Sequence, residues 1–349
     1  MIIAVLISPA TSGCRAIAST AALPTRAMPE GDRIPGFRLI RELGTGGSSR
    51  VYLVEHGLRQ RAVVLKLLRP EVAQDVELTA QLRASLQALR GVRHPHLETL
   101  LEISDDADRL WWVSEYLPGG DLRDRLRSVP DGLPVDDALR ILMEIARGLS
   151  ALHARGLLHR DLKPANILFD VEGRAVIADY GLVVARSDQN TPWRPSLAGG
   201  TPLYMSPEQQ AGGALDGRAD LYSVGCVLHE LLTGQPPYSS DDPHALARLH
   251  ASAATPVLPA RCRWLQPLLD SLLAKSPESR LDNTQQLLTA LQASVSSSPE
   301  AEALRGYSEA AQVRYTTRMT ALPRSLPVWP WIALLAFGIF ALLWQWFVR

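Results

Sequence analysis

From residue 37 onward, apolar and polar residues alternate with the two-residue period that is typical of β-strands. Phe37 and Leu39 precede a glycine-rich turn, after which the alternation resumes. Two further apolar runs, at residues 62–68 and 110–117, are rich in β-branched or aromatic side chains. The pattern therefore predicts a small region built mainly from strands.

Helical spacing follows in one segment of this region and then dominates the rest of the chain. In residues 75–90, leucines recur every three or four positions and predict one apolar helix face. Residues 135–152 show the same amphipathic repeat, residues 121–126 start a short helix, and residues 221–232 predict a buried helix. The chain is therefore predicted to be α+β, with a small strand-rich part before a large helical part.

The first 36 residues are predicted to form a disordered leader. They are rich in Ala, Ser and Thr, and no acidic residue precedes Glu30. The apolar run at residues 2–7 is too short to span a membrane and has no basic residue before it. Translation that begins at Met28 is one interpretation of this segment, and a targeting segment or a structured extension are the others.

A second apolar segment lies at residues 328–348, after a linker predicted at residues 294–327. It contains one strongly polar residue, Gln345, and tryptophans lie near both of its ends. A helix of this length would span about 31 Å, which matches the hydrocarbon core of a bilayer. The pattern predicts a single-pass transmembrane helix, with a buried core helix as the alternative.

Basic residues predict the orientation of this helix. Arg314, Arg318 and Arg324 precede the span, and basic residues favour the cytoplasmic side of a membrane. The sequence therefore predicts a protein of the inner (cytoplasmic) membrane whose preceding domain lies in the cytoplasm.

Composition excludes several classes of protein. The chain has 36 basic and 36 acidic residues, so a bulk charge that would attract nucleic acid is absent. Its three cysteines, Cys14, Cys226 and Cys262, show no C-x-x-C spacing. This argues against a disulfide framework or a zinc site, and it is consistent with a reducing compartment.

Residues 159–166 read His-Arg-Asp-Leu-Lys-Pro-Ala-Asn and gather three chemical groups in one short stretch. Asp161 can orient an attacking hydroxyl group and accept its proton, and Lys163 can stabilise a phosphoryl group. The amide oxygen of Asn166 can bind a metal ion. These are the groups that a phosphoryl-transfer site requires.

This motif, with Asp179-Tyr180-Gly181 and the run Gly-Thr-Pro-Leu-Tyr-Met-Ser-Pro-Glu at residues 200–208, resembles the bacterial eukaryotic-like serine/threonine protein kinases. The resemblance covers roughly residues 37–293. It implies a bilobal protein kinase-like fold, with a small β-rich N-lobe and a large helical C-lobe. It also implies transfer of the ATP γ-phosphoryl group to Ser or Thr hydroxyls of proteins. In that reaction Asp161 and Lys163 are catalytic, and Asn166 and Asp179 bind Mg²⁺, with Mn²⁺ as an alternative.

The resemblance assigns a nucleotide site as well. Glycines in a turn between strands let backbone N–H groups close over phosphates, as in the glycine-rich loop of the family. A strand lysine then pairs with the α- and β-phosphates. The connector at the end of the apolar run at residues 110–117 binds adenine. The residues implied are Leu43, Gly44, Thr45, Gly46, Gly47, Val51, Lys66, Glu115 and Leu117.

The chain departs from the family pattern at two positions, one in the glycine-rich loop and one in the helix predicted at residues 75–90. Ser49 stands where the third glycine of the loop usually falls. Ser85 stands where the helix glutamate that pairs with Lys66 is expected, and Glu77 lies eight residues earlier. A shifted register, a substitute carboxylate and a weakened site all remain open, and lowered activity is expected before lost activity.

Further roles follow from the same resemblance. Arg160 would bind a phosphate on an activation segment at residues 181–200, whose hydroxyls are autophosphorylation candidates. Thr201 together with Lys163 marks Ser/Thr rather than Tyr specificity. Two structural contacts are also implied: Glu208 with Arg280 as a buried ion pair, and Asp220 with the backbone of the catalytic loop. The candidate hydroxyls are those of Ser187, Thr191 and Ser196.

The predicted partners are ATP, protein substrates, the membrane and, for autophosphorylation, a second copy of the chain as a homodimer; no nucleic acid is expected. The alternative function is a membrane-tethered pseudokinase scaffold, which binds nucleotide or partners without catalysis. Ser49 and Ser85 favour that alternative. Four intact residues oppose it: Lys66, Asp161, Asn166 and Asp179. A small-molecule kinase of similar fold is disfavoured by the peptide-docking run that ends at Glu208.

Overall fold

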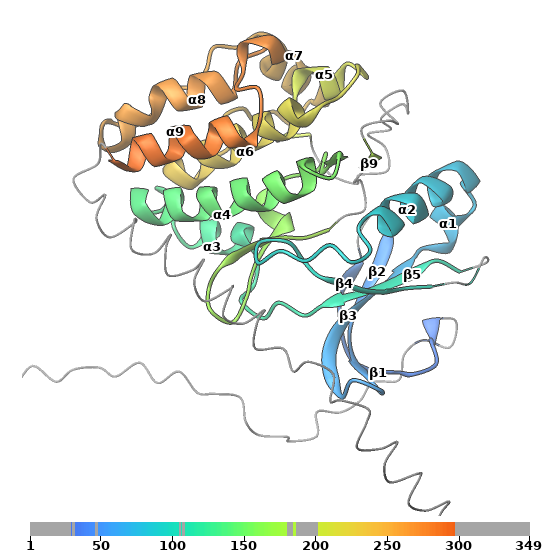
Figure 1. Cartoon of the computed structure of the whole chain (residues 1–349). Coiled ribbons are helices and arrows are strands. Elements are labelled where there is room, and N and C mark those ends of the chain that lie inside the picture. The colour runs from blue at the N-terminus through green and yellow to red at the C-terminus, as the bar shows by residue number, and fades with distance from the viewer. Residues whose placement is uncertain are drawn as a thin grey trace, which may run out of the picture. The chain divides into compact units, whose positions relative to one another are not determined.

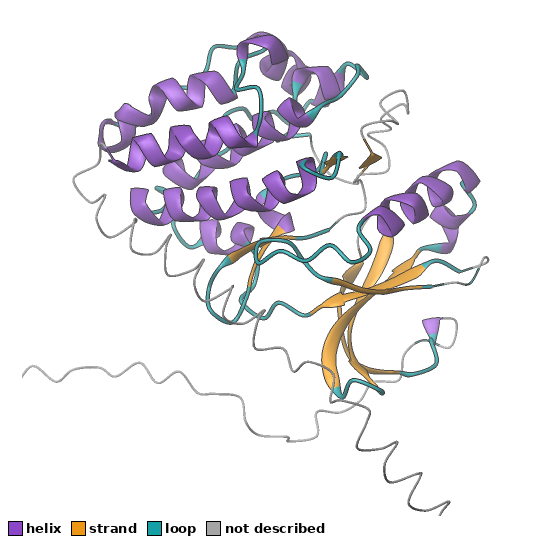
Figure 2. Cartoon of the chain, viewed as in Figure 1, coloured by secondary structure: helices purple, strands orange, loops and turns teal. Residues whose placement is uncertain are grey.

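The computed structural model describes residues 29, 32–45, 48–104, 106, 109–179, 184–185 and 202–296. The described chain divides into two compact units. The small unit contains the residues up to Val92 together with Thr99–Tyr116, and the large unit contains Arg93–Glu98 and the residues from Leu117 onward. Figure 1 traces the elements of each unit, and Figure 2 separates the strands from the helices.

The small unit is built on one antiparallel sheet with the strand order β1-β2-β3-β5-β4. Two helices follow β3, and the side chain of Asp75 caps the second by accepting a hydrogen bond from the Leu78 N–H (3.0 Å). The predicted strands and the predicted helix at residues 75–90 are thereby confirmed. The bounds are β1 (Phe37–Thr45), β2 (Ser49–His56), β3 (Arg61–Leu68), β4 (Leu100–Ile103), β5 (Trp111–Glu115), α1 (Pro70–Ala73) and α2 (Val76–Ala88).

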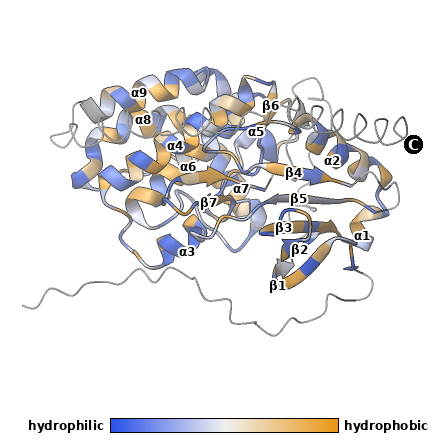
Figure 3. Ribbon diagram, turned by 60° about the horizontal axis from the view of Figure 1, so that its bottom comes forward, coloured by the Kyte–Doolittle hydropathy of each residue, from blue (hydrophilic) through white to orange (hydrophobic). Residues whose placement is uncertain are grey.

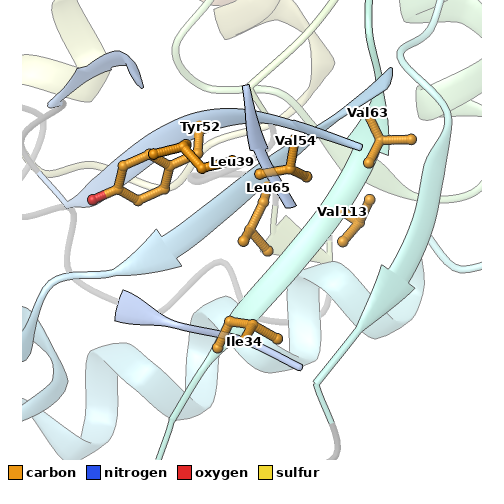
Figure 4. Close-up of a cluster of buried hydrophobic side chains, with 7 residues drawn as sticks. All are labelled: Ile34, Leu39, Tyr52, Val54, Val63, Leu65 and Val113. Atoms are coloured by element: carbon orange, nitrogen blue, oxygen red, sulfur yellow. The ribbon is translucent and has the colours of Figure 1, made fainter. Parts of the chain in front are cut away.

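The register of this sheet brings one group of apolar residues together on the same face. Tyr52 lies opposite Leu65, and Leu65 lies opposite Val113. Directly opposed residues project from the same face of a sheet, so these side chains pack together. They belong to a cluster of buried residues, shown in Figure 4: Ile34, Leu39, Tyr52, Val54, Val63, Leu65 and Val113.

The end of the predicted leader contributes to this core. The sequence places residues 32–36 in the leader, whereas Ile34 is part of the apolar cluster and Asp32 is only 7% exposed. Asp32 accepts hydrogen bonds from the Arg50 guanidinium (2.8 Å) and from the Tyr52 hydroxyl. Burial and this bond to Asp32 raise the pKa of Tyr52 to about 12. Residues 32–36 therefore belong to the small unit, while residues 1–28 lie outside the described chain.

The large unit is mainly helical, with two short strand pairs, β6 with β9 and β7 with β8. Its helices carry hydrophobic and hydrophilic residues on different parts of their surface (Figure 3). The elements are α3 (Leu122–Arg127), α4 (Val135–His153), β6 (Leu157–Leu158), η2 (Pro164–Asn166), β7 (Ile167–Phe169), β8 (Ala175–Ile177), β9 (Val184–Ala185), α5 (Pro207–Gln210), α6 (Gly217–Thr233), α7 (Pro243–Ser252), η5 (Ala260–Leu265), α8 (Gln266–Leu272), η6 (Pro277–Ser279) and α9 (Thr284–Ser296).

Helix α6 is the most completely buried helix of the large unit, and it contacts α4 and α8. It begins four residues before the predicted helix at residues 221–232, because Asp216 caps it by accepting a hydrogen bond from the Arg218 N–H (2.8 Å). Asp220 lies in the first turn of the helix and is 1% exposed.

No helix within the described residues is both long and apolar enough to cross a membrane. Helix α9 ends at Ser296. The predicted transmembrane segment at residues 328–348 and all but the start of the predicted linker lie outside the described residues.

A buried histidine links α7 to α6 in the large unit. His250 is fully buried, and its Nδ1 atom lies 2.8 Å from the Tyr222 hydroxyl. Its ring packs edge-on against Tyr238, at 5.0 Å between centroids. Burial, with the nearby charge of Lys275, lowers the pKa of His250 to about 4.

We expect this histidine to make the unit less stable in mild acid. An unfolded chain protonates a histidine near pH 6.5, whereas folded His250 stays neutral until about pH 4, so falling pH favours the unfolded state over that range. The free energy of unfolding falls by up to about 1.4 kcal/mol per pH unit. Urea unfolding between pH 7 and 4.5 should therefore show a shallower pH dependence for His250→Gln than for wild type. His244→Gln, an exposed position on α7, should leave the slope unchanged, and an equal slope in all three proteins would contradict the assignment.

Candidate active site

Three of the predicted functional side chains meet in the loop between β6 and β7. The Lys163 ammonium lies 2.7 Å from the Oδ2 atom of Asp161. The Asn166 side-chain amide donates to the same Oδ2 atom (2.9 Å) and to the Asp161 backbone oxygen (2.8 Å). Helix η2 makes this convergence local, because it turns the chain between Lys163 and β7. The loop thus presents a carboxylate whose orientation is fixed by an amine and an amide.

Helix α6 anchors the start of this loop. The buried carboxylate of Asp220 accepts hydrogen bonds from the backbone N–H groups of His159 (2.9 Å) and Arg160 (2.8 Å). His153 Nε2 contacts the same carboxylate at 2.7 Å. Burial alone would raise the pKa of Asp220, but the His153 hydrogen bond, the two histidines and the backbone amide hold it below its usual value. The implied role of Asp220 is confirmed.

A second anchor comes from α5, and the sequence reasoning missed it. Arg160 has a left-handed backbone conformation (φ 65°), which costs energy for a residue other than glycine. The Gln209 side chain donates a hydrogen bond to the Arg160 carbonyl (2.7 Å) and is itself 1% exposed. Gln209 directly follows the Ser-Pro-Glu run, which was its only signal in the sequence.

The β7–β8 hairpin brings Asp179 close to Asn166 along the backbone. The Ala178 N–H donates to the Asn166 carbonyl (2.8 Å), so the residue directly before Asp179 is bonded to Asn166. Asp179 is exposed and has a positive φ of 65°. Asp179 and Asn166 therefore lie on hydrogen-bonded neighbouring segments.

These two oxygen donors fit a magnesium ion. The Asn166 NH₂ group is used by Asp161, so the Oδ1 atom is the group it can offer a cation. Mg²⁺ is usually held by one or two protein oxygens together with water and phosphate oxygens. The part of the chain that the structure describes has no group of three or more His, Cys, Asp or Glu residues suited to a metal.

The nucleotide-binding residues predicted in the small unit lie on β1, β2 and β3. Val51 on β2 is directly opposite Lys66 on β3, and their register places both on the sheet face opposite to the apolar cluster. Lys66 is only 7% exposed. Leu43, Gly44 and Thr45 form the end of β1, whereas Gly46 and Gly47 lie outside the described residues.

Helix α2 carries Ser85 and Glu77 on different sides. Ser85 is on the buried side of the helix, is 6% exposed, and donates a hydrogen bond to the Gln81 carbonyl (2.9 Å). Glu77 is exposed in the first turn and receives a contact from the Gln81 amide at 3.5 Å. The buried side of α2 thus carries a hydroxyl where the family has a carboxylate.

The predicted adenine connector begins at the end of β5. The Glu115 N–H donates to the Thr99 carbonyl (3.1 Å), and its carboxylate accepts the Thr99 N–H (2.7 Å). Leu117 is the first connector residue of the large unit. Two residues later, the Gly119 N–H donates to the Phe169 carbonyl (2.8 Å), which fixes the connector against β7.

Replacing Gly119 by alanine should loosen this attachment. A Cβ atom there would lie 2.6 Å from both the Cβ and the backbone oxygen of Phe169, so the connector must shift. We expect a loss of about 1–3 kcal/mol in the free energy of unfolding, measured by urea denaturation. Gly120→Ala is the matched control, because its Cβ meets nothing within 4 Å and only its positive φ (74°) is strained. A smaller loss for Gly119→Ala than for Gly120→Ala would contradict this reading.

The segment after residue 201 is fixed by two polar contacts. Glu208 and Arg280 form a two-pronged ion pair (2.6 and 2.8 Å), and the Arg280 side chain is fully buried, which confirms the predicted bridge. The Tyr204 hydroxyl donates to Glu230 on α6 (2.6 Å), a contact that the sequence reasoning missed. Burial raises the pKa of both Tyr204 and Glu230.

The structure does not describe the hydroxyl residues predicted for autophosphorylation, or the threonine predicted for Ser/Thr specificity. Ser187, Thr191, Ser196 and Thr201 lie outside the described residues. Their assignment therefore stays a prediction.

Comparison with known proteins identifies the family. A family model described as "Protein kinase domain" matches residues 37–291. This chain belongs to the protein kinase family. The expected small β-sheet unit and large helical unit are those of this kinase domain.

The kinase domain is similar to bacterial serine/threonine kinases. Serine/threonine-protein kinase PknF of Mycobacterium tuberculosis is 35% identical over 264 residues, which are 72% of this chain and 55% of PknF. PrkC of Bacillus subtilis is 31% identical over 265 residues, which are 74% of this chain and 40% of PrkC. The chain thus spans about half the length of PknF and about two fifths of PrkC.

A solved structure supports the same fold. The crystal structure of the M. tuberculosis PknI kinase domain matches with a TM-score of 0.62 and 28% sequence identity. The match covers 77% of this chain and 100% of the PknI kinase domain chain. The resemblance first seen in short motifs therefore extends over the whole kinase domain.

Proposed function

We propose that this protein is a serine/threonine kinase that transfers the γ-phosphoryl group of ATP to hydroxyl groups of proteins. The observation that carries the proposal is the convergence of Asp161, Lys163 and Asn166 in one loop, whose backbone Asp220 and Gln209 fix. Preorganised polar groups of this kind supply catalysis in phosphoryl transfer, where positioning and charge stabilisation do most of the work.

Each residue has a distinct role in this proposal. Asp161 orients the substrate hydroxyl and accepts its proton, while the hydrogen bond from Asn166 holds the carboxylate in place. Lys163, 2.7 Å from that carboxylate, stabilises the phosphoryl group as it transfers. Asn166 and Asp179 would hold Mg²⁺, or Mn²⁺ in its place. When bound there, the cation would supply positive charge that offsets the charge of the phosphate groups.

The small unit would supply the nucleotide contacts. Lys66 would bind the α- and β-phosphates, and the glycine-rich turn at residues 43–51 would close over them. Support for this role comes from the position of Lys66, which is only 7% exposed and lies on a central strand directly opposite Val51 of the glycine-rich turn. Glu115 and Leu117 would bind adenine through their backbone groups.

A pseudokinase scaffold is the second candidate, and Ser85 is the observation that favours it. Without a helix carboxylate, one usual contact of the strand lysine is missing. The ordered loop around Asp161 argues for catalysis, because a scaffold needs no carboxylate held by two polar side chains, Lys163 and Asn166. Lowered activity is therefore the expected consequence of Ser85.

The decisive experiment is an assay of the full chain with ATP labelled at the γ-phosphate and casein as the protein substrate. Label on phosphoserine or phosphothreonine, abolished by Asp161→Asn, is expected. Equal label in both proteins, or none in either, would contradict catalysis. Label on phosphotyrosine would contradict the specificity, and label on an aminoglycoside but on no protein would favour a small-molecule kinase. Mixing wild type with Asp161→Asn tests whether one copy phosphorylates another.

The proposal includes attachment to the inner membrane through residues 328–348, with the kinase domain in the cytoplasm. It rests on the apolar length, the flanking tryptophans and the preceding arginines of that segment. Confinement to a membrane would raise the effective concentration of membrane-bound partners, including a second copy. In cell fractionation, the full chain should resist carbonate extraction and dissolve in detergent, whereas a chain ending at residue 327 should not sediment with membranes. Identical behaviour of both chains would contradict the anchor.

A further inference from the structure

Glu98 is a buried carboxylate that no motif in the sequence singled out. It lies in the large unit, two residues before β4, and is only 5% exposed. Its neighbours Leu97 and Leu100 are buried apolar residues, so the local pattern favours an apolar side chain at this position. A buried carboxylate is costly unless hydrogen bonds or charges compensate for the loss of water. Its presence therefore points to a specific role.

The backbone around Glu98 pairs with the end of β8. The Ile177 N–H donates to the His96 carbonyl (3.0 Å), and the Glu98 N–H donates to the Ile177 carbonyl (2.8 Å). Leu97 and Ile177 accordingly form a parallel bridge. These bonds place the Glu98 side chain next to the two residues that follow β8.

Those two residues are also held through their backbone groups. The Ala178 N–H donates to Asn166, and His159 Nε2 lies 3.2 Å from the Ala178 carbonyl. The next group along the chain is the Asp179 N–H, which donates to the Oε2 atom of Glu98 at 3.4 Å. Every backbone polar group from the Ile177 N–H to the Asp179 N–H thus has a partner. The last partner is a side-chain carboxylate.

Asp179 needs such support. Its φ of 65° lies in the left-handed region, which a residue other than glycine keeps only when its surroundings hold it there. A hydrogen bond to an ionised acceptor is stronger than one to a neutral acceptor. The direction of the Asp179 side chain depends on this backbone conformation.

We propose that Glu98 is a positioning residue for Asp179. Its carboxylate accepts the Asp179 N–H and fixes the backbone from which the Asp179 carboxylate would reach a divalent cation. The inference rests on the proposed kinase function, and it assigns the acceptor oxygen of Glu98 to the metal-binding side of the site. Glu98 itself touches neither substrate nor nucleotide in this role.

Two variants of similar size separate this role from simple packing. Glu98→Gln keeps an acceptor oxygen, whereas Glu98→Met removes it. The first readout is the affinity of the full chain for a fluorescent ATP analogue, titrated at several Mg²⁺ concentrations without protein substrate. The second is phosphate transfer, resolved into kcat and KM for ATP. Glu102→Met is the matched control, because Glu102 on β4 contacts His56 and Arg59 instead.

We expect Glu98→Met to weaken Mg²⁺-dependent nucleotide binding about tenfold and to lower kcat by about the same factor, while Glu98→Gln stays within about threefold of wild type. The Glu102 control should match wild type in both assays. Unchanged binding and kcat in Glu98→Met would overturn the proposal. Equal losses in the Gln and Met variants, with a lowered unfolding temperature in both, would also overturn it by indicating a purely structural role. If Glu98→Met does not fold, Glu98→Leu serves in its place.

The binding assay keeps this inference distinct from the proposed function. If wild type binds the nucleotide with Mg²⁺ but transfers no phosphate, the kinase proposal fails. The Glu98 proposal is then still tested by the nucleotide affinities of the Gln and Met variants: weaker binding by the Met variant alone supports it, and equal affinities contradict it.

Discussion

Asp161→Asn should lower kcat for phosphate transfer by about 10²–10⁴-fold. The substitution keeps the size of the side chain and one oxygen that can accept the Asn166 hydrogen bond, so the loop should keep its shape. It removes the proton acceptor, and it also removes the negative charge that lies 2.7 Å from Lys163. The KM for ATP should change far less than kcat, because the lost interaction belongs to the transition state.

Steady-state kinetics with γ-labelled ATP and casein measures this loss. Asp241→Asn is the matched control, since Asp241 is an exposed residue in the bend before α7 and should leave kcat unchanged. Circular dichroism and the unfolding temperature should be the same for all three proteins. An Asp161→Asn protein that retains more than a tenth of wild-type kcat would contradict the role of Asp161 as proton acceptor.

Asp220→Ala should reduce the free energy of unfolding by about 3–5 kcal/mol. The wild-type carboxylate accepts two backbone N–H groups, from His159 and Arg160, and contacts His153 at 2.7 Å. Alanine leaves all three groups buried without this acceptor, and each unsatisfied buried donor is costly. Asp220→Asn should lose less, because its amide oxygen can still accept one of the two backbone bonds.

Urea denaturation followed by circular dichroism checks this expectation. Asp216→Ala is the matched control on the same helix, where loss of the N-terminal cap should cost about 1 kcal/mol. The pKa of Asp220 is lowered in the folded protein, so its contribution is present above the unfolded pKa, near 3.9, and disappears as pH falls below it. Equal losses for Asp220→Ala and Asp216→Ala would refute the anchoring role.

The loop chemistry could be predicted from sequence because its groups are contiguous. Asp161, Lys163 and Asn166 lie within six residues, and the short helix η2 brings them together without any long-range packing. The strand alternation and the leucine spacing likewise predicted the sheet and α2, since each depends on a local period. Ser85 was assigned from the family pattern, and the structure places it on the buried side of α2.

The contacts that were missed all join distant segments. Gln209 reaches Arg160 across 49 positions, and Glu98 reaches Asp179 across 81 positions. No period or spacing in the chain encodes such pairs, because they depend on how packed elements meet. Residues 32–36 were assigned to the leader for the same reason: only the folded sheet provides the partners of Asp32 and Ile34.

The attachment of the catalytic loop to α6 has a consequence for genetics. Because this loop is hydrogen-bonded to the interior of the domain, substitutions that disturb the interior should also disturb the loop, so clones selected for lost phosphate transfer should include substitutions far from Asp161. Gly225 on α6 is one such position, because any added Cβ would lie 2.8 Å from Leu272 and 2.9 Å from Leu273. Random mutagenesis should therefore yield inactive alleles along this helix as well as in the loop itself.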